Sequence, residues 1–79
     1  MNKGQIREML KTFDRNGKYS KRGDFHIANG GYDLWWEMYY KGTPFMTCIY
    51  GNIEDYPCKG ISEDDISKIR ELIKEVFGY

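Results

Sequence analysis

The chain has little of the material from which membrane spans, disulfide frameworks and metal sites are built. Its 79 residues include two cysteines, one histidine and two prolines. No apolar run approaches the roughly 18 residues that a membrane-spanning helix needs. The N-terminal residues are polar and lack the basic segment and apolar stretch of a secretion signal. We therefore expect a cytoplasmic protein without a membrane-spanning segment.

The cysteines are too few and too widely spaced for a zinc site. A structural zinc ion takes four ligands, which usually come in closely spaced pairs. Here the candidates are Cys48, Cys58 and the single His26. An isolated cysteine pair in a chain without a secretion signal is more typical of reduced thiols. The sequence thus predicts two free thiols, with Cys48 half-buried in a strand, and neither a metal nor another cofactor.

Aromatic residues are abundant by contrast, with two Trp, seven Tyr and four Phe. Hydrophobic residues make up 41% of the chain and charged residues 30%, which is typical of a globular protein. A chain of 79 residues is close to the size at which burial only just outweighs conformational entropy. We therefore expect one soluble domain over residues 1–79 whose core uses its large side chains.

The zero net charge hides an uneven distribution. Residues 1–30 hold seven basic and three acidic residues, and residues 31–79 hold five basic and nine acidic residues. The two segments therefore carry net charges of +4 and −4. Such a dipolar surface can steer a charged partner toward one end of the molecule.

Apolar spacing and capping residues predict a helix at each end of the chain. Residues 3–13 follow Asn2, an N-cap residue, and Asn16-Gly17 is suited to ending a helix. The second helix follows the N-cap Ser62 and ends at Gly78. Buried positions at helical spacing are Ile6, Met9, Leu10 and Phe13 in the first helix, and Ile66, Ile69, Leu72, Ile73, Val76 and Phe77 in the second.

Three strands are expected between the helices. Residues 24–28 and 32–40 flank Asn29-Gly30, a strong signal for a two-residue hairpin turn, although Gly31 leaves a three-residue loop as an alternative. Lys41-Gly42, or the longer 41–44, leads into a strand at 45–50, and residues 53–56 are a candidate edge strand. The sequence thus predicts an α+β domain of order α-β-β-β-α, a three-stranded antiparallel meander with both helices on one face.

Alternation along the strands assigns the side chains to two faces. The core face is expected to hold Phe25, Ile27, Leu34, Trp36, Met38, Tyr40, Phe45, Thr47 and Ile49. The opposite face is expected to hold Asp33, Trp35, Glu37, Tyr39, Met46, Cys48 and Tyr50. One sheet needs only one apolar face to fold, so the rings on the second face are available for binding.

These rings are the main functional candidate. Tyr, Trp and Met are enriched where proteins bind one another. We expect a protein-binding face formed by Trp35, Tyr39, Met46 and Tyr50 together with Asp33 and Glu37. A homodimer that buries the same rings is a variant of this hypothesis.

No catalytic set accompanies this face, so we expect a protein that is not an enzyme. His26 is expected near Asp33, but no nucleophile stands at a defined spacing from them. Gly30-Gly31 opens a strand, whereas a phosphate-binding loop opens a helix. The chain, taken as complete from Met1, is short and has no signal or catalytic set. In these respects it is similar to anti-CRISPR and other inhibitors encoded by phages and mobile elements. That resemblance implies a host defence complex as the partner.

Nucleic-acid binding is the alternative function. Basic residues around one tyrosine make a segment that could contact phosphates and stack on a base: Arg15, Lys18, Tyr19, Lys21 and Arg22. The expected element order is also that of double-stranded RNA-binding domains. Those domains have basic residues where the last helix begins, whereas this chain has Glu63-Asp64-Asp65 there, which would repel phosphates.

Overall fold

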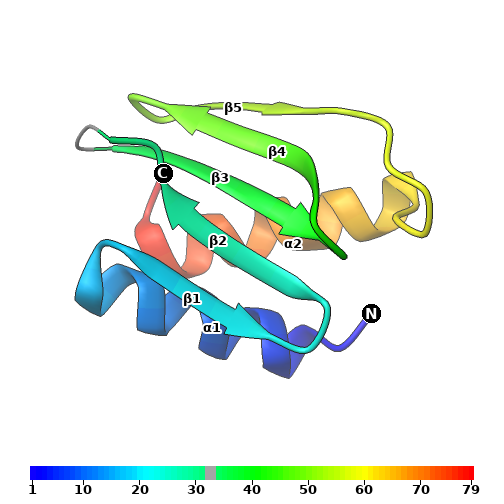
Figure 1. The fold of residues 1–79 in the computed structure, drawn as a ribbon, viewed down its shortest axis with the longest axis horizontal. Coiled ribbons are helices and arrows are strands. Elements are labelled where there is room, and N and C mark those ends of the chain that lie inside the picture. The colour runs from blue at the N-terminus through cyan, green and yellow to red at the C-terminus, as the bar shows by residue number, and fades with distance from the viewer. Residues whose placement is uncertain (32–33) are drawn as a thin grey trace.

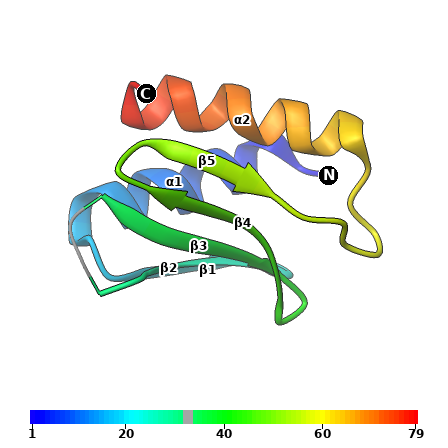
Figure 2. The same ribbon diagram turned by 90° about the horizontal axis from the view of Figure 1, so that it is seen from above.

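The computed structural model describes residues 1–31 and 34–79, and the described residues form two helices and five strands. The elements are α1 (Lys3–Asn16), β1 (Tyr19–Arg22), β2 (Phe25–Asn29), β3 (Trp35–Tyr40), β4 (Thr43–Ile49), β5 (Asn52–Asp55) and α2 (Glu63–Phe77). The strands form one antiparallel sheet in chain order (Figure 1). Both helices lie on the same face of this sheet (Figure 2). The predicted α+β class is confirmed, with more strands than expected.

Both helices are capped by the residues that the sequence indicates, although α1 runs to Asn16, beyond the expected end at residue 13. The Asn2 side chain accepts a hydrogen bond from the Gln5 backbone N–H at 3.1 Å, and Gly17 closes α1 with a left-handed φ of 67°. At α2, the Ser62 hydroxyl and the Asp65 carboxylate each accept the other residue's backbone N–H, at 3.0 and 3.1 Å. These reciprocal bonds also lower the pKa of the Asp65 carboxyl.

The core lies between the helices and the sheet. Trp36 is 2% exposed, as predicted, and its indole Nε1–H donates to the Tyr79 hydroxyl at 2.7 Å. The Phe13 and Phe77 rings bring the two helices together with centroids 6.2 Å apart. The buried apolar residues are Ile6, Met9, Leu10, Phe13, Phe25, Ile27, Trp36, Met38, Phe45, Met46, Cys48, Ile69, Leu72 and Ile73.

Strand β1 replaces the polar connection that we expected between the first helix and the sheet. Its backbone pairs with β2, and Ser20 lies opposite Ile27 with only 3% of its surface exposed. Gly23, with a φ of 59°, makes the tight turn between the two strands. The residues on its inner side, Ser20 and Arg22, are polar, so hydrophobic alternation gave no sign of the strand.

The predicted Asn29-Gly30 hairpin turn is wrong. The Gly30 backbone N–H donates to the Trp35 carbonyl at 2.8 Å, so strand pairing continues through Gly30 and the chain reverses later. Ile27 nevertheless lies opposite Met38, which keeps the expected faces of β2 and β3. Leu34, expected in the core, precedes β3 with a φ of 58° and is 57% exposed.

A β-bulge in β4 overturns our assignment of faces along that strand. Phe45 is an extra residue between the partners of Met38 and Tyr39, and both Phe45 and Met46 are fully buried. An extra residue reverses the side-chain alternation beyond it. Met46 and Cys48 therefore lie in the core at 0% exposure, whereas Thr47 and Ile49 lie on the opposite face.

Two further turns have the left-handed geometry of two-residue hairpins. Lys41 and Gly42 have φ values of 49° and 81°, which confirms the shorter of the two expected turns. Tyr50 and Gly51 repeat this geometry between β4 and β5, with φ values of 51° and 83°. This second turn holds the Tyr50 ring out at one end of the sheet, where it is 70% exposed.

Candidate functional site: the open face of the sheet

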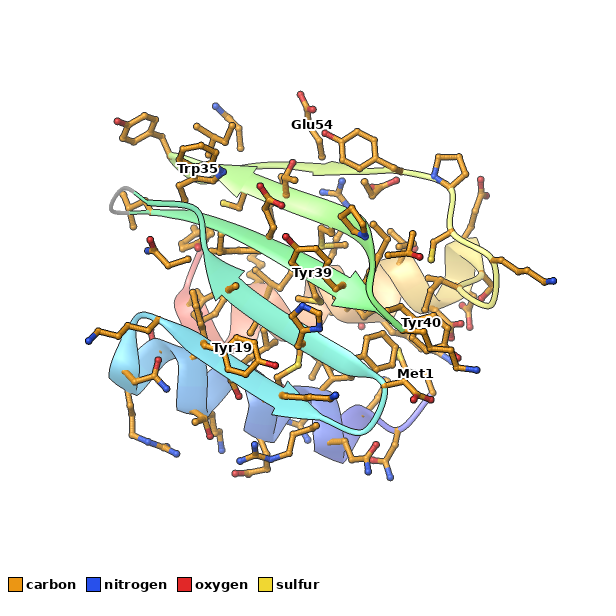
Figure 3. The ribbon with its side chains drawn as sticks, in the orientation of Figure 1. Met1, Tyr19, Trp35, Tyr39, Tyr40 and Glu54 are labelled. Carbon is orange, nitrogen blue, oxygen red and sulfur yellow. The ribbon has the colours of Figure 1, made fainter. Side chains whose placement is uncertain are left out.

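The face of the sheet opposite the helices is not covered by any described element (Figure 2). Every second residue of each strand points to this face, which we call the open face. Figure 3 views it directly and shows Tyr19, Tyr39 and Trp35 on it. The pairing places on it Tyr19, Lys21, His26, Ala28, Trp35, Glu37, Tyr39, Thr47, Ile49 and Glu54.

Three rings form a row across β1, β2 and β3. His26 stacks on Tyr39 with ring centroids 4.2 Å apart and planes within 9°, and Tyr19 lies 5.6 Å from His26 on the other side. Partial burial and the Lys21 ammonium lower the pKa of His26 below its ordinary value of 6.5. Both effects favour the neutral form of His26.

Two glutamates on the open face each accept a hydrogen bond from the tyrosine two residues further along the chain. The Tyr39 hydroxyl donates to the Glu37 carboxylate at 2.8 Å, and the Tyr56 hydroxyl donates to Glu54 at 3.1 Å. The Thr47 hydroxyl lies 3.4 Å from that of Tyr56. The bond to Glu37 is also the main cause of the raised pKa of Tyr39. The sequence thus uses the same Glu-x-Tyr pattern on β3 and at the end of β5.

The two Glu-x-Tyr pairs lie side by side, with β4 between them. Glu37 is opposite Thr47, and Thr47 is opposite Glu54. Two strand spacings, about 10 Å, therefore separate the backbones of the two glutamates. Both glutamates line a depression of about 340 Å³, together with Tyr56 but not Tyr39. Its other lining residues are Trp35, Thr47, Ile49, Tyr50 and Asn52.

Close packing against a glycine determines where the Trp35 ring lies. A Cβ atom on Gly30 would come within 2.5 Å of the Trp35 ring. Only a residue without a side chain leaves room for the indole across the neighbouring strand. Gly30 therefore serves here as a platform for Trp35.

The structure brings together part of the predicted protein-binding face. Trp35, Glu37 and Tyr39 lie on the open face, and Tyr50 lines the depression from the adjoining turn. Met46 was assigned wrongly, because the bulge turns it into the core. Asp33, the remaining member, lies outside the described residues.

The residues of the alternative nucleic-acid site are divided between two sides of the sheet. Tyr19 and Lys21 point to the open face, whereas Arg22 points to the helices and donates to the Thr12 hydroxyl at 3.2 Å. Arg15 lies in the last turn of α1 and donates to the same hydroxyl at 3.2 Å. Lys18 is exposed between α1 and β1. The segment is therefore not a single basic surface.

Sequence reasoning missed several members of the open face. Thr47 and Ile49 were assigned to the core, and Tyr19 was expected in a loop. Glu54 and Tyr56 were not singled out, although the repeated Glu-x-Tyr pattern at 37–39 and 54–56 was a visible signal. In both cases the tyrosine follows the glutamate by two residues, so in a strand the two side chains point to the same face of the sheet.

The described residues hold no cluster of three or more His, Cys, Asp or Glu side chains placed to bind a metal ion. Within the same residues, no helix is both long enough and apolar enough to cross a bilayer. Both cysteines are free thiols, and Cys48 lies on the core side away from His26. No protein family, curated protein or solved structure matches this chain. The site must therefore be interpreted from its own chemistry.

Proposed function

We propose that the protein is a small, non-enzymatic binding module that docks on another protein through its open face. The observation that carries this proposal is a sheet face with aromatic rings and no covering helix among the described residues. Tyr and Trp are the side chains most enriched where binding energy concentrates. Here Trp35 and Tyr39 are half-buried already, so they lose little freedom when a partner covers them.

Contacts within the open face prepare it for binding. Tyr39 is held by its stack on His26 and its hydrogen bond to Glu37, and Trp35 is held on Gly30. Rings that are fixed before association lower the entropy cost of docking. The fixed orientation of these rings is more typical of a binding surface than of rings that are exposed by chance.

The size of the face limits the kind of complex that it can form. Five strands spaced by about 4.8 Å and about five residues long give a flat area of roughly 400 Å². A standard interface takes about 800 Å² from each partner. A stable complex would therefore also use the adjoining turns, including exposed Tyr50.

We further propose that such a module acts in the cytoplasm as an inhibitor encoded by a phage or another mobile element. The uncovered aromatic face supports this role, because an inhibitor needs only a surface that blocks its target. Affinity purification from candidate host lysates, with mass spectrometry, tests it by identifying the target. The single variants Trp35→Ala, Tyr39→Ala and Tyr50→Ala should each weaken target capture by about 2 kcal/mol.

A matched control removes charge instead of rings. The combined replacement of Arg15, Lys18, Lys21 and Arg22 by Gln should change mainly the association rate and its salt dependence. Capture that survives the loss of the rings but not of these charges would refute the aromatic interface. It would instead support the alternative, nucleic-acid binding through residues 15–22, or docking on an acidic groove of a protein.

One observation favours that alternative. The row of Tyr19, His26 and Tyr39 lies beside Lys21, and rings next to a cation are what single-stranded nucleic acids use for stacking and phosphate contact. The carboxylates of Glu37 and Glu54 on the same face oppose it by repelling phosphates. A steep loss of binding with added salt would distinguish nucleic acid from protein.

A further inference from the structure

We propose that the depression lined by Glu37 and Glu54 binds an arginine side chain of the partner protein. This inference rests on the proposed protein-binding function and names the chemistry that the open face recognises. The depression has a volume of about 340 Å³, at the small end of the roughly 300–1,000 Å³ of ligand pockets. It is thus suited to a side chain and not to a large ligand.

The charge of the depression selects a cation. Among the described residues that line it, Glu37 and Glu54 carry negative charge and none carries positive charge. Neither glutamate forms an ion pair with a described residue, whereas Glu75, Asp64 and Asp55 pair with Arg7, Lys68 and Arg70. Two carboxylates on either side of one depression leave negative charge for a ligand to neutralise.

The tyrosines arrange this charge without neutralising it. Each hydroxyl occupies one acceptor position of its glutamate, at 2.8 Å for Glu37 and 3.1 Å for Glu54. An ionised carboxylate has about four acceptor positions, so about three remain on each. The tyrosine bonds fix the direction of the carboxylates, which lowers the cost of holding them for a ligand.

The walls of the depression favour a flat cation. Trp35, Tyr50 and Tyr56 supply three aromatic rings at its rim, and the negative faces of such rings attract cations. A guanidinium is planar, stacks on aromatic rings and has five N–H donors. It can therefore contact rings and two carboxylates at once, whereas the compact, strongly hydrated ammonium of lysine is less suited to stacking.

The experiment titrates the isotope-labelled chain with the peptide acetyl-Gly-Arg-Gly-amide and follows it by NMR. We expect saturable shifts of the Trp35 indole N–H and of the Thr47 backbone amide. The same peptide with citrulline in place of arginine keeps the shape and removes the charge. It should bind at least about tenfold more weakly, because charge-assisted hydrogen bonds are about twice as strong as neutral ones.

A pair of double variants locates the charge that matters. Glu37→Gln with Glu54→Gln keeps acceptors for both tyrosines and should weaken binding of the arginine peptide at least about tenfold. The control, Glu8→Gln with Glu71→Gln, removes the same charge from exposed positions on the two helices. It should leave the affinity within about twofold, because distant surface charges are screened by salt.

Three results would overturn the inference: no saturable shift, equal binding of the citrulline peptide, or equal loss in both double variants. A fourth contradicting result would be self-association, detected by sedimentation analysis as a dimer of this chain that buries the open face. Target capture distinguishes a failure of the arginine site from a failure of the proposed docking function. If Trp35→Ala abolishes capture and the Glu37/Glu54 double variant does not, the docking face stands and the arginine site falls. If neither change affects capture, the proposed function falls as well.

Discussion

Trp35 and Trp36 are adjacent in sequence, yet the structure predicts very different energetic roles for them. Trp36 is 2% exposed and bonds to Tyr79, so Trp36→Ala should remove about 3 to 5 kcal/mol from the free energy of unfolding. A chain of this size has a total of about 4 to 12 kcal/mol. This variant should therefore lose roughly a quarter or more of that free energy, and at the lower end of the range it should be unfolded.

Trp35→Ala should cost only about 1 kcal/mol. On the open face the ring lies over Gly30 and opposite Ile49, and such cross-strand contacts are worth about 0.2 to 1 kcal/mol each. Trp36→Phe is a milder probe of the core that keeps a ring but loses the bond to Tyr79. Its expected cost is about 1 to 2 kcal/mol.

Urea unfolding followed by far-ultraviolet circular dichroism measures all three variants without relying on tryptophan fluorescence. With a slope near 1 kcal/mol per molar urea, Trp36→Phe should lower the midpoint by about 1 to 2 M. Trp35→Ala should lower it by about 1 M or less. Equal losses for Trp35→Ala and Trp36→Ala would contradict an uncovered open face, because they would mean that a further layer or second subunit covers it.

The remaining predictions concern Gly30, which directly follows β2, and His26, which lies on β2. Gly30→Ala should displace the Trp35 ring and cost about 1 to 3 kcal/mol, visible as a changed Trp35 indole N–H shift; an unchanged shift would contradict the contact. His26 should titrate below pH 6.5 by NMR, because burial and Lys21 lower its pKa in the folded chain. Since the unfolded chain then binds the proton more readily, the lowered pKa of His26 stabilises the folded chain as the pH rises. This stabilisation is complete above about pH 6.5. It is lost as the pH falls through the lowered pKa, and His26→Gln should remove that pH dependence; a midpoint above 6.5 would contradict the reasoning.

Local patterns predicted the features that are determined locally. Asn2, Gly17, Ser62 and Gly78 mark the helix ends because capping depends on a few neighbouring backbone groups. The alternation of strand side chains separated Trp35 from Trp36 correctly, although the predicted turn before them was wrong. The observed and expected registers of β2 and β3 differ by an even number of residues, which leaves the faces unchanged.

The features that depend on neighbouring strands could not be read from the sequence. The bulge at Phe45 depends on how β4 packs against β3 and the helices, and it reversed the faces of Met46 and Thr47. β1 forms because the edge of β2 offers backbone partners to a polar segment. For the site, Trp35, Glu37 and Tyr39 could be identified from strand alternation, whereas the depression depends on the position of β5 relative to β3.

The strand order, in which every strand pairs with its neighbour in the chain, also determines how this protein reaches its native state. Successive hairpins close short loops, so most of the sheet can form with little loss of chain entropy. The packing of α2 on α1 is different, since the ion pair between Arg7 and Glu75 spans 68 residues. During synthesis α2 emerges after the five strands, so until then the α2 side of the core has no cover. We therefore expect late intermediates, rather than the native fold, to be the species that aggregates or engages chaperones.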